Sequence, residues 1–140
     1  MGPGAQRRSG RCGGPRCDGG YRPGMGRTWR DGDGVLRVGG EVVALEVAAS
    51  YRARARGLLG RDGIDGAMLI TPCASVHTFR MRFAIDVAYL DRDLTVLAVR
   101  TMVPGRLGLP RPRARHVLEA AAGAMAGWGV RPGVRLVVEG

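Results

Sequence analysis

The sequence predicts a mainly β fold, with an α+β class at the margin, in one compact domain of roughly six to eight short strands. We expect mostly antiparallel strands in a small barrel-like or rolled sheet, with one or two short helices. The prediction depends on short runs containing Val, Leu and Ile, separated by Gly and Pro turn signals. Only residues 51–59 show a clear helical spacing of apolar side chains.

The chain divides into a tail and a domain. With 140 residues it is long enough for one core and short for two. Residues 1–30 are rich in Gly, Pro and Arg and hold too little apolar material to offset the entropy of ordering, so we expect a disordered tail. Residues 31–140 form the predicted domain. Because aromatic residues make up 5% of the chain, the core should consist mainly of Val, Leu, Ala and Ile.

The formal charge of +10 is concentrated in the tail. All 22 basic residues are Arg, against 12 acids, and residues 1–30 hold seven Arg and one acid. A weak polyanion or nucleic-acid contact could therefore come from the tail rather than from the domain. No run approaches the roughly 18 apolar residues of a membrane span, and no secretory apolar region follows the first arginines. We expect a cytoplasmic protein with no membrane span.

The domain begins with a predicted β-hairpin and a helix. Two alternating apolar runs, residues 35–38 and 41–47, are joined by Gly39 and Gly40, a sequence typical of a tight turn. Ser50 is a suitable N-cap for a helix over residues 51–59. The remaining predicted elements follow in order: a helix stop at Gly60, strands at 67–70, 76–79 and 85–90, a turn at 91–93, a return strand at 94–102, a loop at 104–112, a strand or helix at 116–122, a turn or short helix at 123–130, and a closing strand at 134–138.

Asp86 is the most unusual residue of the domain, because it lies inside an apolar strand pattern. Burying an unpaired carboxylate costs several kcal/mol, so Asp86 must face outward or meet donors such as an arginine or backbone amides. It is either a structural strut or part of a ligand-binding or catalytic site. The candidate arginine partners for it are Arg56, Arg61, Arg80 and Arg82.

His77 could act as a general base, a metal ligand or a packed core residue. The other histidine, His116, and Cys73 complete too small a set for a metal site, so no metal or cofactor is expected. The odd number of cysteines, two of them in the tail, argues against a disulfide framework, and Cys73 fits a buried, unreactive thiol. The common phosphate-binding, dinucleotide-binding, serine-hydrolase and zinc-protease motifs are missing from the sequence.

Arg56 and Arg61 flank the end of the predicted helix. They could form a fork for a carboxylate, phosphate or sulfate. Alternatively, they neutralise the last helical carbonyls.

Several motifs together resemble a known family: R-x-R-G-L-L-G-R at 54–61, G-A-M-L-I at 66–70, S-V-H-T-F-R-M-R-F-A-I-D-V at 75–87, Y-L-D at 89–91 and V-L-E-A-A-A-G at 117–123. Their order is typical of the bacterial and archaeal family called domain of unknown function 192, over about residues 35–140. The resemblance implies a small, mostly β domain with no established activity or cofactor. Its shared polar positions match Arg56, Arg61, Asp86 and Glu119. His77 stands where much of the family has Trp, and Ala84 replaces a proline.

We therefore expect a small non-enzymatic or accessory binding domain. Its polar site would contain Arg56, Arg61, His77, Asp86 and Glu119 and accept a small anionic or saccharide-like ligand. One alternative is an enzyme that uses Asp86 or Glu119 as acid or base together with His77. Another is polyanion or nucleic-acid association through the basic tail.

Overall fold

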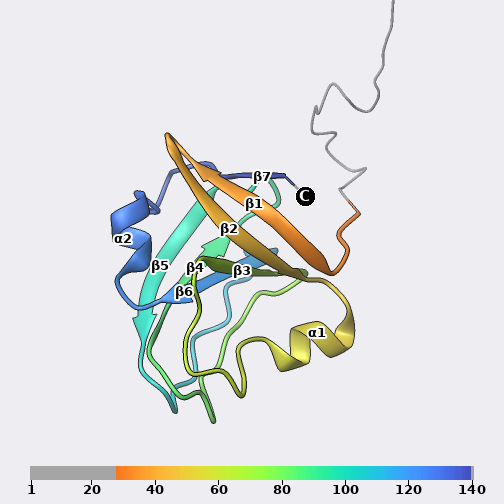
Figure 1. The fold of residues 1–140 in the computed structure, drawn as a ribbon, viewed down its shortest axis with the longest axis vertical. Helices are drawn as coiled ribbons and strands as arrows, with labels where there is room; N and C mark the ends of the chain where they lie inside the picture. Colours follow the sequence, from red (N-terminus) through yellow and green to blue (C-terminus); the bar gives the residue numbers. More distant parts are fainter. Residues whose placement is uncertain (1–27, 140) are drawn as a thin grey trace, which may run out of the picture.

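The computed structural model describes residues 28–139, which form one curled seven-stranded sheet with two short helices (Figure 1). The strands are β1 (Gly32–Val38), β2 (Glu41–Ala48), β3 (Ala67–Ile70), β4 (Ile85–Leu90), β5 (Val96–Met102), β6 (His116–Ala121) and β7 (Val137–Glu139), and the helices are α1 (Tyr51–Arg56) and α2 (Ala124–Trp128). Their order across the sheet is β5-β4-β6-β3-β2-β1-β7. Within it β2 and β3 pair in parallel, and the other neighbours are antiparallel.

The sheet curls so that its two edge strands, β5 and β7, approach each other. The chain at the start of β5 and the chain just before β7 are joined by hydrogen bonds. The amide of Val96 donates to the carbonyl of Val134 at 2.8 Å, and the amide of Leu136 donates to the carbonyl of Leu94 at 2.9 Å. Beyond these bonds β5 and β7 do not continue as a ladder, so the sheet is rolled rather than closed into a barrel. The predicted mainly β class with a rolled sheet is confirmed.

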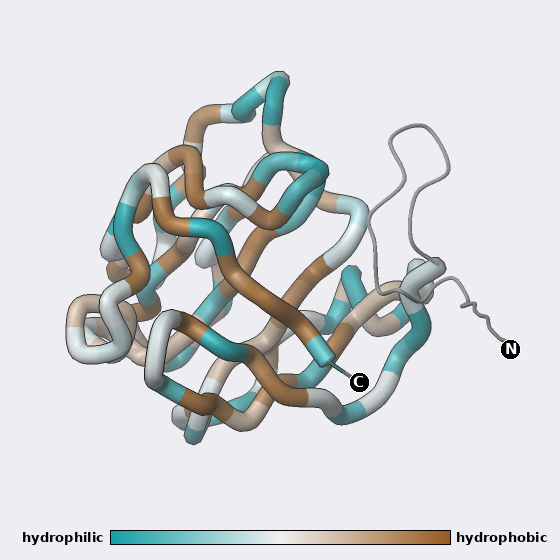
Figure 2. Tube along the Cα trace, turned by 90° about the horizontal axis from the view of Figure 1, so that it is seen from above, coloured by the Kyte–Doolittle hydropathy of each residue, from teal (hydrophilic) through white to brown (hydrophobic). Residues whose placement is uncertain are grey.

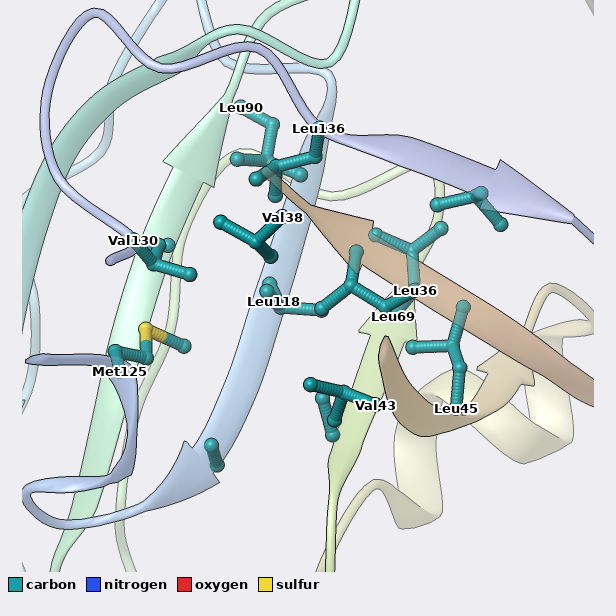
Figure 3. Packing of buried hydrophobic residues seen from close by; sticks show 14 of the residues in the cluster. Leu36, Val38, Val43, Leu45, Leu69, Leu90, Leu118, Met125, Val130 and Leu136 are labelled. Carbon is teal, nitrogen blue, oxygen red and sulfur yellow. The ribbon is translucent and has the colours of Figure 1, made fainter. Parts of the chain in front are cut away.

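The concave side of the sheet holds the larger apolar cluster. Leu36, Leu69 and Leu118 from three strands are fully buried there, and Met125 of α2 closes one end (Figure 3). Along the chain, apolar stretches alternate with polar ones (Figure 2). Apart from Met125, its buried members are aliphatic, as the low aromatic content predicts, and Trp29 and Trp128 pack against them partly buried.

A second apolar cluster covers the opposite side of β3, β4 and β6. It contains Leu58, Val76, Met81 and Tyr89, contributed by the loop after α1, the β3–β4 loop and β4. Because both sides of the middle of the sheet are covered, every residue of β4 is buried, as are the first five residues of β6. Any acid on these two strands is therefore buried, whichever side it faces.

The local predictions succeed where turn chemistry is strong. The hairpin around Gly39 and Gly40 is confirmed, as are the strands at 67–70 and 85–90. The ambiguous stretch at 116–122 is a strand, because β6 pairs with both β3 and β4 and tertiary pairing outweighs the helix propensity of its alanines.

Three predicted elements are corrected. The helix ends at Arg56 instead of running to residue 59, because Gly57 leaves the helical conformation with φ of 49°. Residues 76–79 are not a strand; they form one bridge, His77 with Leu107, before Arg80 turns the chain at φ of 65°. The closing strand covers only residues 137–139.

No helix within residues 28–139 is both long enough and apolar enough to cross a membrane.

Candidate functional site

The two buried acids, Asp86 and Glu119, lie on opposite sides of the sheet. In the β4–β6 pairing Asp86 lies opposite Ala120, and Glu119 lies opposite Val87. Side chains directly opposite each other share a side, and neighbours along a strand alternate, so the two carboxyl groups point away from each other. The five candidate residues therefore do not converge on one point.

Asp86 is a strut within the concave side. Its Oδ1 accepts a hydrogen bond of 2.7 Å from the Thr101 hydroxyl. Its Oδ2 accepts bonds from the amides of Gly123 at 2.9 Å and Met125 at 3.2 Å. These amides belong to the start of α2, whose own N-cap residue, Gly123, has no side chain to satisfy them. Asp86, on β4, thus provides the N-terminal capping hydrogen bonds of α2.

None of the four candidate arginines bonds to Asp86, whereas backbone amides, the alternative donors considered from the sequence, do. Arg61 forms a two-pronged ion pair with Glu46, at 2.7 and 2.8 Å, and Arg82 pairs with Asp62 at 3.1 Å. Hydrogen bonding to Arg61 lowers the pKa of Glu46. Arg61 faces a separate depression beside β2 and the start of α1. Amides and a hydroxyl satisfy Asp86 without a second buried charge, which explains why no guanidinium is needed.

The environment of Glu119 differs from that of Asp86. Its side chain is 5% exposed, and burial raises its pKa from the ordinary 4.5 to about 7. No other residue between 28 and 139 donates a hydrogen bond to its carboxyl group. The carboxyl group instead faces a pocket, where a ligand or solvent can reach it.

The pocket that contains Glu119 has a volume of about 270 Å³, and we call it the α1 pocket. Its walls are α1 with the following loop on one side and residues 70–81 on the other. Its apolar lining includes Leu58, Ile70, Val76 and Met81. Its polar lining consists of Arg54, Arg56, Cys73, Ser75, His77 and Glu119. A small apolar cavity with a few converging polar groups is the usual form of a small-molecule site.

Local structure explains how this pocket forms. Ser50 accepts a hydrogen bond of 3.1 Å from the Ala53 amide and so starts α1. Gly57 then ends the helix within two turns, and the chain turns inward to bury Leu58. The opposite wall is fixed to the sheet where the Thr71 amide donates to the carbonyl of Ala48 at 3.0 Å. Because α1 is short and its start and end are fixed, it does not cover Glu119, and the α1 pocket remains beside this residue.

The other predicted site residues divide between the pocket and elsewhere. Arg56 and His77 line the α1 pocket together with Glu119. His77 is exposed and stacks on Phe79, with ring centroids 5.1 Å apart. Arg61 and Asp86 lie outside this pocket.

Sequence reasoning missed Arg54 and Ser75 as lining residues. Arg54 could have been found from the helix itself, because it lies in the same last turn as Arg56. Arg54 donates to the carbonyls of Ala49 and Pro72, at 3.3 and 3.4 Å, and so bridges the two walls. Nothing in the local sequence marks Ser75.

Cys73 lies in the same wall as a partly buried thiol. Its Sγ donates to the carbonyl of Ser75 at 3.0 Å, and burial raises the pKa of the thiol. A thiol that resists ionisation is a poor nucleophile, which fits the unreactive cysteine predicted from the sequence. In the part of the chain that the structure describes, no three His, Cys, Asp or Glu side chains are grouped so that they could hold a metal ion.

Comparison with known proteins places this geometry in a family. The family model described as "Uncharacterized ACR", domain of unknown function 192, matches residues 34–138. The chain belongs to this family. The resemblance inferred from the motifs is therefore confirmed, and the match covers both walls of the α1 pocket.

Relatives are found among archaeal UPF0127 proteins. The one from Pyrococcus horikoshii is 36% identical over 84 residues, which cover 56% of this chain and 73% of that protein. The one from Pyrococcus furiosus is 30% identical over 104 residues, which cover 69% of this chain and 90% of that protein.

Two crystal structures share the fold. A candidate transcription regulator from Sinorhizobium meliloti is 20% identical with a TM-score of 0.68, covering 80% of this chain and 98% of that one. A protein of unknown function from Novosphingobium aromaticivorans is 21% identical with a TM-score of 0.65, covering 84% of this chain and 91% of that one. At these identities the likeness concerns the fold alone.

Proposed function

We propose that the chain is a small-molecule-binding domain whose ligand occupies the α1 pocket. The observation that supports this most directly is Glu119, a buried carboxyl group that faces an open cavity and receives no hydrogen bond from residues 28–139. Because the pocket leaves this carboxyl group open to solvent, a ligand can replace water there and supply the hydrogen bonds that no described residue supplies.

The lining of the pocket defines the chemistry of the ligand. With a pKa of about 7, Glu119 can donate or accept a hydrogen bond near neutral pH, and hydroxyl groups are partners for both forms. Arg54 and Arg56 lie in the helical wall and favour a negative group. A cavity of about 270 Å³ limits the ligand to a compact molecule. We therefore expect a small saccharide, a sugar acid or a hydroxy acid.

A thermal-shift screen of the full chain against monosaccharides, sugar acids, hydroxy acids and phosphate tests this proposal. A ligand at about 100 times its dissociation constant adds about 2.7 kcal/mol to the free energy of unfolding. For a domain of this size, each kcal/mol raises the melting temperature by about 4–8 °C. We expect a concentration-dependent rise with at least one compound that carries a hydroxyl group.

Two variants assign the response to the pocket. Glu119→Leu keeps a side chain of similar size but has no carboxyl group for a ligand to bond, so it should abolish the ligand-induced rise. Arg131→Gln, an exposed position outside the pocket, should leave the rise unchanged. The proposal fails if no compound stabilises the chain, or if the rise persists in Glu119→Leu.

The same pocket favours a second candidate, an enzyme that uses Glu119 as acid or base. A catalytic carboxyl group works best when its pKa lies near the working pH, and Glu119 and His77 line one cavity. Asp86 lies outside this pocket, so this candidate depends on Glu119. Incubating each stabilising compound with the wild-type chain and with Glu119→Gln, followed by NMR, separates the candidates: chemical conversion by the wild type alone supports an enzyme, and an unchanged compound supports a binding domain.

The tail-mediated polyanion contact remains a prediction, because residues 1–27 lie outside the described part of the chain. Deleting residues 1–30 should abolish a steeply salt-dependent affinity for nucleic acid if that prediction holds.

A further inference from the structure

Two loops that lie side by side expose apolar side chains at one end of the molecule. They are the β3–β4 loop and the β5–β6 loop, and both reach the lower end of the view in Figure 1. The amide of Gly105 donates to the carbonyl of Thr78 at 2.8 Å, and the amide of Gly108 donates to the carbonyl of Val76 at 2.8 Å. The Thr78 hydroxyl also donates to the carbonyl of Val103 at 2.7 Å. We call residues 77–82 and 103–109 the loop surface.

Four large apolar side chains of this surface are open to solvent. Leu107 and Leu109 are 70% and 78% exposed, and Phe79 and Val103 are 46% and 48% exposed. Leu107 pairs with His77 across an antiparallel bridge, which places their side chains on the same side, and His77 stacks on Phe79. Leu107 and Phe79 are therefore neighbours, and Val103 and Leu109 belong to the same two hydrogen-bonded loops. Such a patch marks a surface that meets something apolar.

The charge around this patch has one sign. Residues 71–85 and 100–115 contain seven arginines and no Asp or Glu. Among them, Arg80 and Arg106 are exposed on the loop surface itself. One acid from elsewhere, Asp62, pairs with Arg82, which leaves the surroundings strongly positive. Proteins that lie on an anionic bilayer bind it by burying apolar side chains in the interface and by attraction between basic side chains and lipid phosphates. The loop surface offers both kinds of side chain.

We propose that the loop surface binds peripherally to anionic membranes, with Leu107 and Leu109 entering the interface and the arginines contacting lipid phosphates. This inference is independent of the proposed ligand site. A second copy of the chain is disfavoured, because the formal charge of +10 makes two copies repel. A folded acidic protein would need a matching surface for side chains that project from convex loops. A bilayer adapts its shape and supplies negative charge and hydrocarbon together.

Vesicle co-sedimentation with the full chain tests the inference. Phosphatidylcholine vesicles with and without phosphatidylglycerol provide a neutral and an anionic surface. We expect binding to the anionic vesicles that weakens as salt rises, and at least tenfold weaker binding to the neutral ones. Leu107→Ser with Leu109→Ser should weaken anionic binding about tenfold or more, because it removes the inserted groups.

Matched variants separate the loop surface from the remaining positive charge, including that of the tail. Arg80→Gln with Arg106→Gln removes two charges from the surface and should weaken binding about 30-fold. Arg131→Gln with Arg135→Gln removes two charges at the opposite end of β4 and β5, where Arg135 bridges to Thr95, and should change binding less than about threefold. Val42→Ser, at another exposed apolar position, should have no effect.

The result that overturns the inference is equally direct. If all these chains bind anionic vesicles equally, the attraction comes from charge outside the loop surface. If the wild-type chain binds neither vesicle at low salt, the loop surface is not a membrane contact, and an acidic protein partner becomes the occupant to seek.

Discussion

Replacing Glu119 with glutamine should make the domain more stable at high pH and little different at low pH. Burial raises the pKa of Glu119 from 4.5 to about 7, so the folded chain holds this proton more tightly than the unfolded chain does. Between these two values the unfolded chain has lost the proton while the folded chain still carries it. The free energy of unfolding therefore falls as pH rises from about 4.5 and levels off above about 7.

The magnitude follows from the same two values. Each pKa unit is worth about 1.4 kcal/mol, so the wild-type chain should lose about 3 kcal/mol between pH 4.5 and pH 8 through this one group. Glutamine has nearly the same shape and does not titrate. The difference in unfolding free energy between Glu119→Gln and the wild type should therefore grow by about 3 kcal/mol over this range.

Urea unfolding at a series of pH values, followed by tryptophan fluorescence, measures this difference directly. Every other titrating group is common to both chains and cancels in the comparison. Glu41→Gln, an exposed position at the start of β2, is the control and should show no such growth. A constant difference between Glu119→Gln and the wild type from pH 4.5 to 8 would refute the reasoning, because it would mean that Glu119 is not held in a desolvated site.

Two further predictions concern the scaffold. Asp86→Ala should destabilise the fold by about 2–3 kcal/mol in urea unfolding, because it leaves the amides of Gly123 and Met125 at the start of α2 without their acceptor; Thr101→Val removes one of the three bonds and should cost only about 1 kcal/mol. Similar losses in both variants would contradict the strut. Gly66→Ala should destabilise by more than about 2 kcal/mol, because Gly66 has φ of 99° and an added Cβ would collide with the carbonyl oxygen of Ala44. Gly63→Ala, where an added Cβ meets open space, should stay within about 0.5 kcal/mol in the same assay, and an equal effect at both glycines would refute the clash.

Sequence reasoning succeeds in this protein where structure is set by neighbouring residues. The Gly39-Gly40 turn fixes the first hairpin, and Ser50 fixes the start of α1. It leaves alternatives open where distant pairing decides. Residues 116–121 become a strand because β3 and β4 pair on both sides of them, which an alanine-rich run does not signal.

The same limit applies to the candidate site. The apolar strand pattern marks Asp86 and the family resemblance marks Glu119, but which side each acid faces depends on the pairing of β4 with β6. A shift of one residue in that pairing would place both acids on the same side of the sheet. The location of Arg56, His77 and Glu119 around one pocket depends in turn on the early end of α1 at Gly57.

The two acids show how equal burial can have opposite consequences. Asp86 and Glu119 are 3% and 5% exposed, yet Asp86 accepts three hydrogen bonds and Glu119 accepts none from the described residues. The bonded acid contributes to stability, and its removal should weaken the fold. The unbonded acid opposes stability at neutral pH, and its removal should strengthen the fold while abolishing the proposed ligand binding. A residue that weakens its own fold and lines an open pocket has the trade-off expected of a functional group.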